Sequence, residues 1–270
     1  MHGTDFSPKS KPHLNERNAA GWTALSKAAS CGHKGVVELL KNGAGVNFAD
    51  CDGWTALAYA TLHGHQNLVS LLLQHGVQVD YSDKHRKTPL MFAAENGYGD
   101  VASLLLLGGA DADATDDDGK TPLIFTTLHQ HYKNMLLLIK MDCVVNAKSH
   151  YGRTPFKYTF ENGHYDVATL LLDHDAKVDA TDRNGKAPIA YASENGRHEI
   201  ALQLIKHGAA VDLKDADGWT PLLYAACYGH HSIILLLLDR YASINLTDKK
   251  GRSALMFAAR EGHRDIVSLL

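Results

Sequence analysis

The chain repeats one short pattern at a fixed spacing of 33 residues. The segment Thr-Pro-Leu-Met at 88–91 represents the pattern, and a Thr or a replacement for it recurs at every step. The recurring positions are Thr23, Thr55, Thr88, Thr121, Thr154, Ala187, Thr220 and Ser253, with one residue fewer in the first interval. A fixed period of this length indicates stacked copies of one supersecondary unit. The sequence therefore predicts an array of repeats, in which function is carried by the surface.

The repeat at 83–115 predicts two short helices. Thr88 suits the N-cap of the first helix, and Pro89 suits the position after it because its missing N–H has no helical partner there. Gly97 supplies the positive φ that ends this helix. A second helix is expected over about 100–107, before Gly108-Gly109 and an Asp-rich turn. The same helix-start position holds five of the seven prolines: Pro89, Pro122, Pro155, Pro188 and Pro221.

Three motifs of the repeat match a known family. They are Asp-Gly-Trp-Thr-Pro-Leu at 217–222, the Gly-His pairs at 32–33, 64–65, 163–164, 229–230 and 262–263, and the Leu-Leu-Leu runs at 71–73, 104–106 and 170–172. On these residues the chain resembles the ankyrin repeat family over 18–270. The resemblance implies an all-α ankyrin-repeat solenoid of antiparallel helix pairs with β-hairpin-like loops. It also implies that the loop tips and the first helices line a concave face.

We expect a flexible N-terminal tail over 1–17 and an ankyrin repeat domain over 18–270. The expected repeats are 18–49, 50–82, 83–115, 116–148, 149–181, 182–214, 215–247 and a truncated copy at 248–270. Lys27 stands where the other copies have an aromatic residue, which fits a capping repeat. The last copy stops within its second helix with Ile266, Val267 and Leu270 still apolar. We therefore expect the chain to continue past 270 and these side chains to form an exposed face.

Composition excludes several classes of partner. The net charge of −3 gives no cationic excess for nucleic acid. The longest apolar run, 233–238, is too short to span a bilayer, and the polar segment after Met1 is not a signal peptide. The four cysteines show no paired spacing and indicate reduced thiols. The sequence thus predicts a monomer in the cytoplasm or nucleus, without membrane insertion or nucleic-acid binding.

Motifs for catalysis and cofactors are incomplete. Gly119-Lys120-Thr121 resembles the end of a phosphate-binding loop, but Ala114 stands where that motif requires Gly, and the carboxylates of 116–118 would repel phosphate. The acidic segment 215–218 lacks the Glu that closes a calcium loop. No side chains show a recognisable catalytic arrangement. We expect neither a catalytic site nor a cofactor.

Histidines recur in one slot, but without the further ligands of a metal site. They are His33, His65, His131, His164, His230 and His263. No Cys or carboxylate completes a tetrahedral set around them. The family resemblance implies that this His ties its loop to the neighbouring backbone. We therefore expect no metal site.

One column combines aromatic and basic side chains. The position before the recurring Thr holds Trp22, Trp54, Lys87, Lys120, Arg153, Lys186, Trp219 and Arg252, which we call the ladder. By the resemblance, the ladder lies on the concave rim, and Trp and Arg are enriched at binding hot spots. We predict that the ladder binds a partner, together with Tyr151 and Tyr228. Packing of each Trp on the neighbouring loop is the alternative. As exposed loop residues, the basic members are expected to contribute little to stability.

Two further columns flank the ladder. The aromatic residues four positions after the recurring Thr are expected to pack in the core, because they adjoin the Ala-Ala pair. Carboxylates at the end of the first helix, Glu95, Glu161 and Glu194, are expected to form exposed ion pairs with the ladder. Such a mixed face favours a protein or peptide partner over a uniformly acidic polymer.

The fourth and fifth copies depart most from the pattern. Gln130 replaces the Gly that ends the first helix, and Asp142 and Asp175 replace a later Gly. A side chain in the left-handed conformation costs roughly 1–2 kcal/mol. Thr126-Thr127 and Thr159-Phe160 replace the Ala-Ala pair. These departures mark either a functional region or drift in a redundant array.

Together these features predict a non-enzymatic scaffold or adaptor that binds protein or peptide segments. One alternative is the targeting module of a larger enzyme whose catalytic domain lies beyond residue 270. Another is a binder of nucleic acid or anionic lipid through the basic part of the ladder. Steep weakening of binding by salt would distinguish the latter.

Overall fold

The computed structural model describes residues 14–270, apart from the side chains of Glu161, Asn162 and Tyr165. The expected tail residues 1–13 and the carboxylate expected at Glu161 therefore lie outside the described part. The chain divides into two compact units, one ending at Asp117 and one spanning Asp118–Leu270. Each unit is described by itself.

The first unit contains three helix pairs. They are α1 (Ala24–Ser30) with α2 (Gly35–Lys41), α3 (Ala56–Leu62) with α4 (Gln66–Gln74), and α5 (Pro89–Asn96) with α6 (Gly99–Leu107). Helix α1 contacts α3, and α3 contacts α5, so the first helices of successive copies pack directly. The core between them is made of small and branched apolar residues such as Ala29, Leu57 and Leu90.

The second unit contains five helix pairs of the same kind. They are α7 (Pro122–Leu128) with α8 (Tyr132–Lys140), α9 (Pro155–Asn162) with α10 (Tyr165–Leu172), α11 (Pro188–Glu194) with α12 (His198–Lys206), α13 (Pro221–Tyr228) with α14 (His231–Asp239), and α15 (Ala254–Glu261) with α16 (Arg264–Leu269). No strand occurs among residues 14–270; the extended pairing there is an isolated bridge between Thr247 and Ser253. The predicted all-α fold of paired helices is confirmed.

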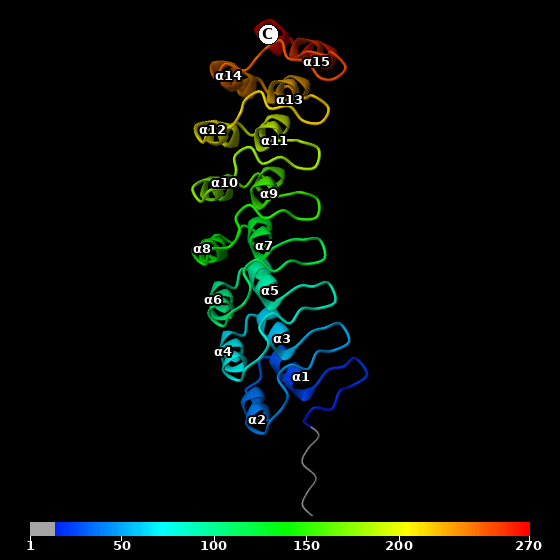
Figure 1. The fold of residues 1–270 in the computed structure, drawn as a ribbon, viewed down its shortest axis with the longest axis vertical. Coiled ribbons are helices and arrows are strands. Elements are labelled where there is room, and N and C mark those ends of the chain that lie inside the picture. The colour runs from blue at the N-terminus through cyan, green and yellow to red at the C-terminus, as the bar shows by residue number, and fades with distance from the viewer. Residues whose placement is uncertain (1–13) are drawn as a thin grey trace, which may run out of the picture. The chain divides into compact units, whose positions relative to one another are not determined.

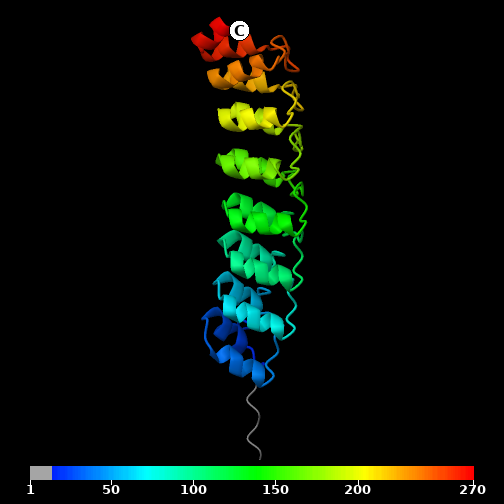
Figure 2. The ribbon, with the colours of Figure 1, turned by 90° about the vertical axis from the view of Figure 1, so that its left-hand side faces the viewer.

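Each unit has two sides that carry different elements. Within each unit, the hairpin loops project from the odd-numbered helices on the side away from the even-numbered helices (Figure 1). The turned view shows successive helix pairs of a unit as separate layers (Figure 2). We call the surface formed by the odd-numbered helices and their hairpin loops the hairpin face. It is the face that the family resemblance predicts to be concave.

The helix ends follow the predicted local signals. The Thr88 hydroxyl accepts the N–H of Met91, Pro89 occupies the first turn, and Gly97 ends α5 with φ +74°. Thr121 is an exception, because its buried hydroxyl has no hydrogen-bond partner.

The repeated histidines join neighbouring copies, as the resemblance implies. Nε2 of His65 lies 3.3 Å from the carbonyl oxygen of Ser30, and Nε2 of His230 lies 2.9 Å from that of Glu194. His263 makes the same contact with Cys227 at 3.1 Å. These imidazoles are structural.

Two expectations about the ends need revision. The side chain of Asn15 accepts the N–H of Gly45, and Arg17 donates to the carbonyl of Ala49, so the end of the expected tail is held by the first copy. Of the side chains expected to form an exposed face, Val267 is 37% exposed and Leu270 is partly exposed, but Ile266 is 0% exposed. The apolar side chains exposed at the last copy are chiefly Leu255 and Met256 of α15, because the first helix carries the stacking surface.

Left-handed backbone occurs where the sequence replaces Gly, as predicted. The φ angles are +59° at Gln130, +57° at Asp142 and +62° at Asp175. Arg86 (+60°) and Tyr241 (+62°) were not predicted, although both also stand in glycine slots of the repeat. The slot of Tyr241 is open, since a Cβ at the equivalent Gly208 would meet nothing within 4 Å. Side chains are tolerated there at the cost of backbone strain alone.

Replacing Gln130 with Gly should raise the free energy of unfolding by about 1 kcal/mol, because Gly removes the left-handed strain. Gln130 is exposed and makes no side-chain hydrogen bond in the described structure, so the substitution removes few stabilising contacts. Denaturant unfolding measures the change. Gln130→Ala is the matched control and should give no gain. A loss of stability in Gln130→Gly would contradict the strain account.

Candidate functional site

The ladder residues hold fixed positions because their main chains close the hairpin turns. The N–H of Trp54 donates to Oδ1 of Asp50 at 2.9 Å, and that of Trp219 donates to Oδ1 of Asp215 at 2.8 Å. Further bonds of this type are Trp22 to Asn18, Lys87 to Asp83, Arg153 to Ser149, Lys186 to Asp182 and Arg252 to Asp248. A short turn thus presents the side chain next to the N-cap of each first helix.

In the first unit, the ladder is built into a row of aromatic rings. The Trp54 ring lies between those of Tyr59 and Phe92, at centroid distances of 5.2 and 4.6 Å. Trp22 also packs against Tyr59, at a centroid distance of 4.2 Å. Nζ of Lys87 lies 5.2 Å from the Phe92 ring centroid. Trp22 and Trp54 therefore do pack on neighbouring parts of the array, which is the role stated above as the alternative to binding.

The second unit continues the same scheme with cations between rings. Nζ of Lys186 lies 4.5 Å from the Tyr191 centroid and 3.9 Å from the Tyr224 centroid. Trp219 lies between Tyr224 and Phe257, at 4.8 and 4.5 Å. Arg252 and Arg153 extend the series: the Arg252 guanidinium is 4.6 Å from Phe257, and the Arg153 guanidinium is 6.0 Å from Tyr158. Cation–π contacts of this kind stabilise by about 0.5–2 kcal/mol.

Four basic ladder residues form ion pairs with carboxylates. Lys87 contacts Glu95 at 2.6 Å and Lys186 contacts Glu194 at 2.7 Å, as the two columns predicted. Lys120 pairs with Asp118 at 2.7 Å, and Arg252 pairs with Asp248 at 2.6 Å. These pairs were expected to be exposed, but the Lys186 side chain is only 11% exposed. The expectation that Lys186 is an exposed loop residue is therefore wrong, because aromatic rings and a carboxylate enclose its side chain.

The aromatic column lies partly in the core and partly at its edge. Phe92, Phe125, Tyr158 and Phe257 are buried, as predicted. Tyr59, Tyr191 and Tyr224 are half-buried, with hydroxyls that donate to Asp50, Asp182 and Asp215 at 2.5–2.6 Å. Burial and the carboxylate partner raise the pKa of Tyr59 and of Tyr224. These rings are consequently fixed in place as neutral phenols.

Two predicted binding residues are much more exposed than the ladder. The Tyr151 residue, at the tip of the hairpin that also carries Arg153, is 58% exposed. Tyr228, at the end of α13, is 53% exposed. Its pKa is raised by burial and by the neighbouring Glu194 and Glu261. Both tyrosines offer aromatic surface on the hairpin face.

Sequence reasoning missed a buried ion pair in the second unit. Nζ of Lys157 lies 2.8 Å from Oδ2 of Asp182, and the two side chains are 8% and 6% exposed. Lys157 also lies 4.3 Å from the Tyr191 centroid. The available signal was a lysine in a slot that most other copies fill with apolar residues such as Ala190 and Leu223. Burial alone would raise the pKa of Asp182, but hydrogen bonds from Lys157, Tyr191 and the Lys186 main chain lower it to about 2.

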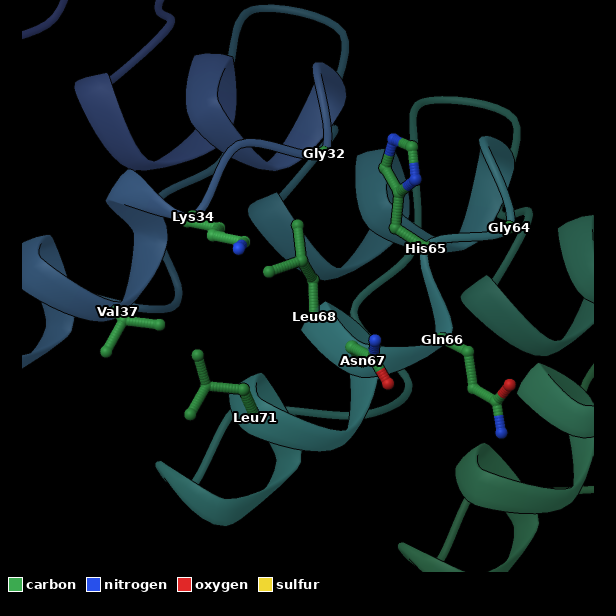
Figure 3. A pocket seen from close by; sticks show the side chains of 9 residues that line it. All are labelled: Gly32, Lys34, Val37, Gly64, His65, Gln66, Asn67, Leu68 and Leu71. Carbon is green, nitrogen blue, oxygen red and sulfur yellow. The ribbon is translucent and has the colours of Figure 1, made fainter.

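A hollow of about 640 Å³ lies elsewhere in the first unit, between α2 and α4. Figure 3 shows Lys34, Val37, Leu68 and Leu71 gathered around it. No ladder residue lines it, and His65 at its margin is already bonded to Ser30. Within residues 14–270, no group of three or more His, Cys, Asp or Glu side chains is placed to hold a metal ion. No helix in that range is both long and apolar enough to cross a bilayer.

Lys186→Met should lower the free energy of unfolding by about 1–2 kcal/mol. Methionine keeps the apolar stem but removes the charge that lies between two rings and beside Glu194. Thermal or denaturant unfolding at neutral pH measures the loss. Lys249→Met, at an exposed hairpin tip, is the matched control and should change stability by less than about 0.5 kcal/mol. Equal effects of the two changes would contradict the enclosed position of Lys186.

Lys157→Met should alter how stability depends on pH. The folded-state pKa of Asp182 is about 2, below the ordinary value of 3.8, so its stabilisation is present above pH 4 and is lost as pH falls toward 2. Without Lys157 this pKa rises, and stability at pH 7 drops by about 2 kcal/mol. Unfolding free energies of both proteins between pH 2 and 7 test this. Their difference should shrink between pH 4 and 2; a constant difference would contradict the assignment.

Comparison with known proteins agrees with this architecture. The model of the family described as ankyrin repeats (three copies) matches residues 6–83, 25–116, 90–182, 137–215 and 189–270. No curated protein matches the chain. Ankyrin repeats are generally protein–protein interaction modules and are typically non-catalytic. The matches run from residue 6 to residue 270, and the chain belongs to the ankyrin repeat family.

Proposed function

We propose that this chain is a non-enzymatic scaffold that binds protein or peptide segments on its hairpin face. The observation that carries the proposal is the ladder with its two exposed tyrosines. Trp22, Trp54 and Trp219 are half-buried rather than sealed, and Tyr151 and Tyr228 are more than half exposed. Tryptophan, tyrosine and arginine are the residue types that dominate binding energy at protein interfaces.

The ladder is well suited to binding because it is already ordered. Ring contacts, ion pairs and main-chain hydrogen bonds hold Lys186, Trp219 and Arg252 in place before any partner arrives. Side chains that are fixed in advance lose little conformational entropy on binding. The Tyr151 and Tyr228 rings add contact area with few rotatable bonds.

The sequence-derived details extend this proposal. Repeats bounded as 18–49 through 248–270 would form one binding domain that acts as a monomer in the cytoplasm or nucleus. The support is compositional: four cysteines without paired spacing, and a net charge close to neutral.

Site-specific photo-crosslinking tests the proposed face. A benzophenone amino acid at Tyr151 or Tyr228 should crosslink a protein partner in extract, because both are exposed residues of the elements that form the hairpin face. The matched controls are the same probe at Leu107 and Tyr241, which are 78% and 92% exposed. Leu107 is the last residue of the second helix α6, and Tyr241 lies in the turn that follows the second helix α14. Crosslinks of equal yield and identity at all four positions would contradict binding on the hairpin face.

A further inference from the structure

The indole rings of Trp54 and Trp219 each pack against two other aromatic rings of the protein. Trp54 lies between Tyr59 and Phe92, and Trp219 lies between Tyr224 and Phe257. The ring planes are tilted by 33–46° at centroid distances of 4.5–5.2 Å. A partner that approaches either half-buried residue therefore meets mainly the edge of the indole ring rather than its face.

The indole edge carries a hydrogen-bond donor that the protein leaves unused. Neither indole N–H has a hydrogen-bond partner among the described residues. Neither nitrogen is among the fully buried unsatisfied atoms, so both remain accessible to solvent. The edge of an aromatic ring is electropositive, and the indole N–H can only donate. The complementary partner group is consequently a hydrogen-bond acceptor and not a cation.

The surrounding charges argue against an acidic acceptor. Beside Trp219, Lys186 is paired with Glu194 and Arg252 with Asp248. Near Trp54, Lys84 pairs with Asp52 and Lys87 with Glu95. An incoming carboxylate would have to compete with these pairs and would meet their carboxylates at close range. A neutral acceptor, such as a backbone carbonyl, meets neither obstacle.

Only some backbone conformations leave the carbonyl groups free to accept a hydrogen bond from a partner. Helices and paired strands use their carbonyls internally, whereas a polyproline II segment leaves them all unpaired. Aromatic-lined surfaces recognise such segments because the extended conformation costs little entropy to adopt. Within each unit, the aromatic row supplies that surface together with one or more indole donors.

We propose that Trp54 in the first unit and Trp219 in the second each donate an indole hydrogen bond to a backbone carbonyl of an uncharged, proline-containing segment in the polyproline II conformation. This rests on the proposed binding at the hairpin face and specifies its partner. The aromatic neighbours hold the indole edge outward, and the paired charges disfavour acidic and basic segments alike.

Peptide selection on the full chain tests the proposal. The probe is a phage-displayed library of random dodecapeptides, and selected peptides are then synthesised. We expect uncharged, proline-containing peptides whose affinity changes less than about twofold between 50 and 500 mM salt, since no counterions are released. Addition of such a peptide to the ¹⁵N-labelled chain should shift indole N–H signals assigned to Trp54 or Trp219.

Trp54→Phe and Trp219→Phe keep an aromatic ring in the row but remove the donor. Each substitution should lower the affinity for the peptide that the Trp contacts by about fivefold, which corresponds to the loss of one net hydrogen bond. Lys206→Met, at the exposed end of the second helix α12 and away from the hairpin loops, is the control and should leave affinity unchanged. Circular dichroism should show that each variant keeps the helicity of the wild-type chain and is therefore folded. The indole shifts are measured on the wild-type chain and so do not depend on the folding of the variants.

The outcomes separate the two proposals. The indole proposal is overturned if the selected peptides are charged and crosslink from Tyr151 or Tyr228. It is also overturned if the selected peptides are uncharged but are insensitive to both Trp→Phe changes and shift no indole signal. Both outcomes leave the hairpin face as the binding site. If no selected peptide crosslinks at Tyr151 or Tyr228, both the indole proposal and the proposed function fail.

Discussion

Hydrogen bonds between the main chains of successive hairpins place the ladder. The N–H of Lys84 donates to the carbonyl of Asp52 at 2.9 Å, and in the second unit the N–H of Ala216 donates to Asn184 at 2.8 Å and that of Lys249 to Asp217 at 3.0 Å. Several hairpins are also closed internally by one of their own side chains, such as Asp50, Ser149 and Asp215. Within a unit these bonds fix the spacing of the turns, and so determine which side chains of neighbouring copies meet.

This arrangement gives the ladder side chains two roles. Lys186 and Trp219 stabilise the contact between adjacent copies through the rings of Tyr224 and Phe257, and they also form part of the surface available to a partner. Alanine substitution would remove both contributions together. Changes that preserve packing, such as Trp to Phe or Lys to Met, separate them, because they remove a donor or a charge and retain most of the apolar volume.

Local features were predictable from the sequence. The caps at Thr88, the left-handed φ at Gly97 and the strained Gln130 each depend on a few neighbouring residues, and the 33-residue period shows which positions are equivalent. Arg86 and Tyr241 were predictable by the same comparison, since both replace Gly. Contacts between copies were harder to predict from the sequence. The Lys157–Asp182 pair joins residues 25 apart, and whether a charge in an apolar slot finds a partner depends on the geometry of the next hairpin. The exposure of Lys186 was also misjudged, because a loop position does not reveal that rings of two copies enclose it.

Hydrogen exchange of the ladder amides tests most directly whether the hairpins form an ordered surface. In the structure, the main-chain N–H groups of Trp54, Lys186 and Trp219 are bonded to Asp carboxylates rather than to water. If these bonds persist in solution, the three amides should exchange at rates comparable to those of the first helices, such as Ala225 in α13. Exchange at the rate of an unstructured peptide would contradict the account, because the rings and charges of the ladder would then have no fixed positions to occupy.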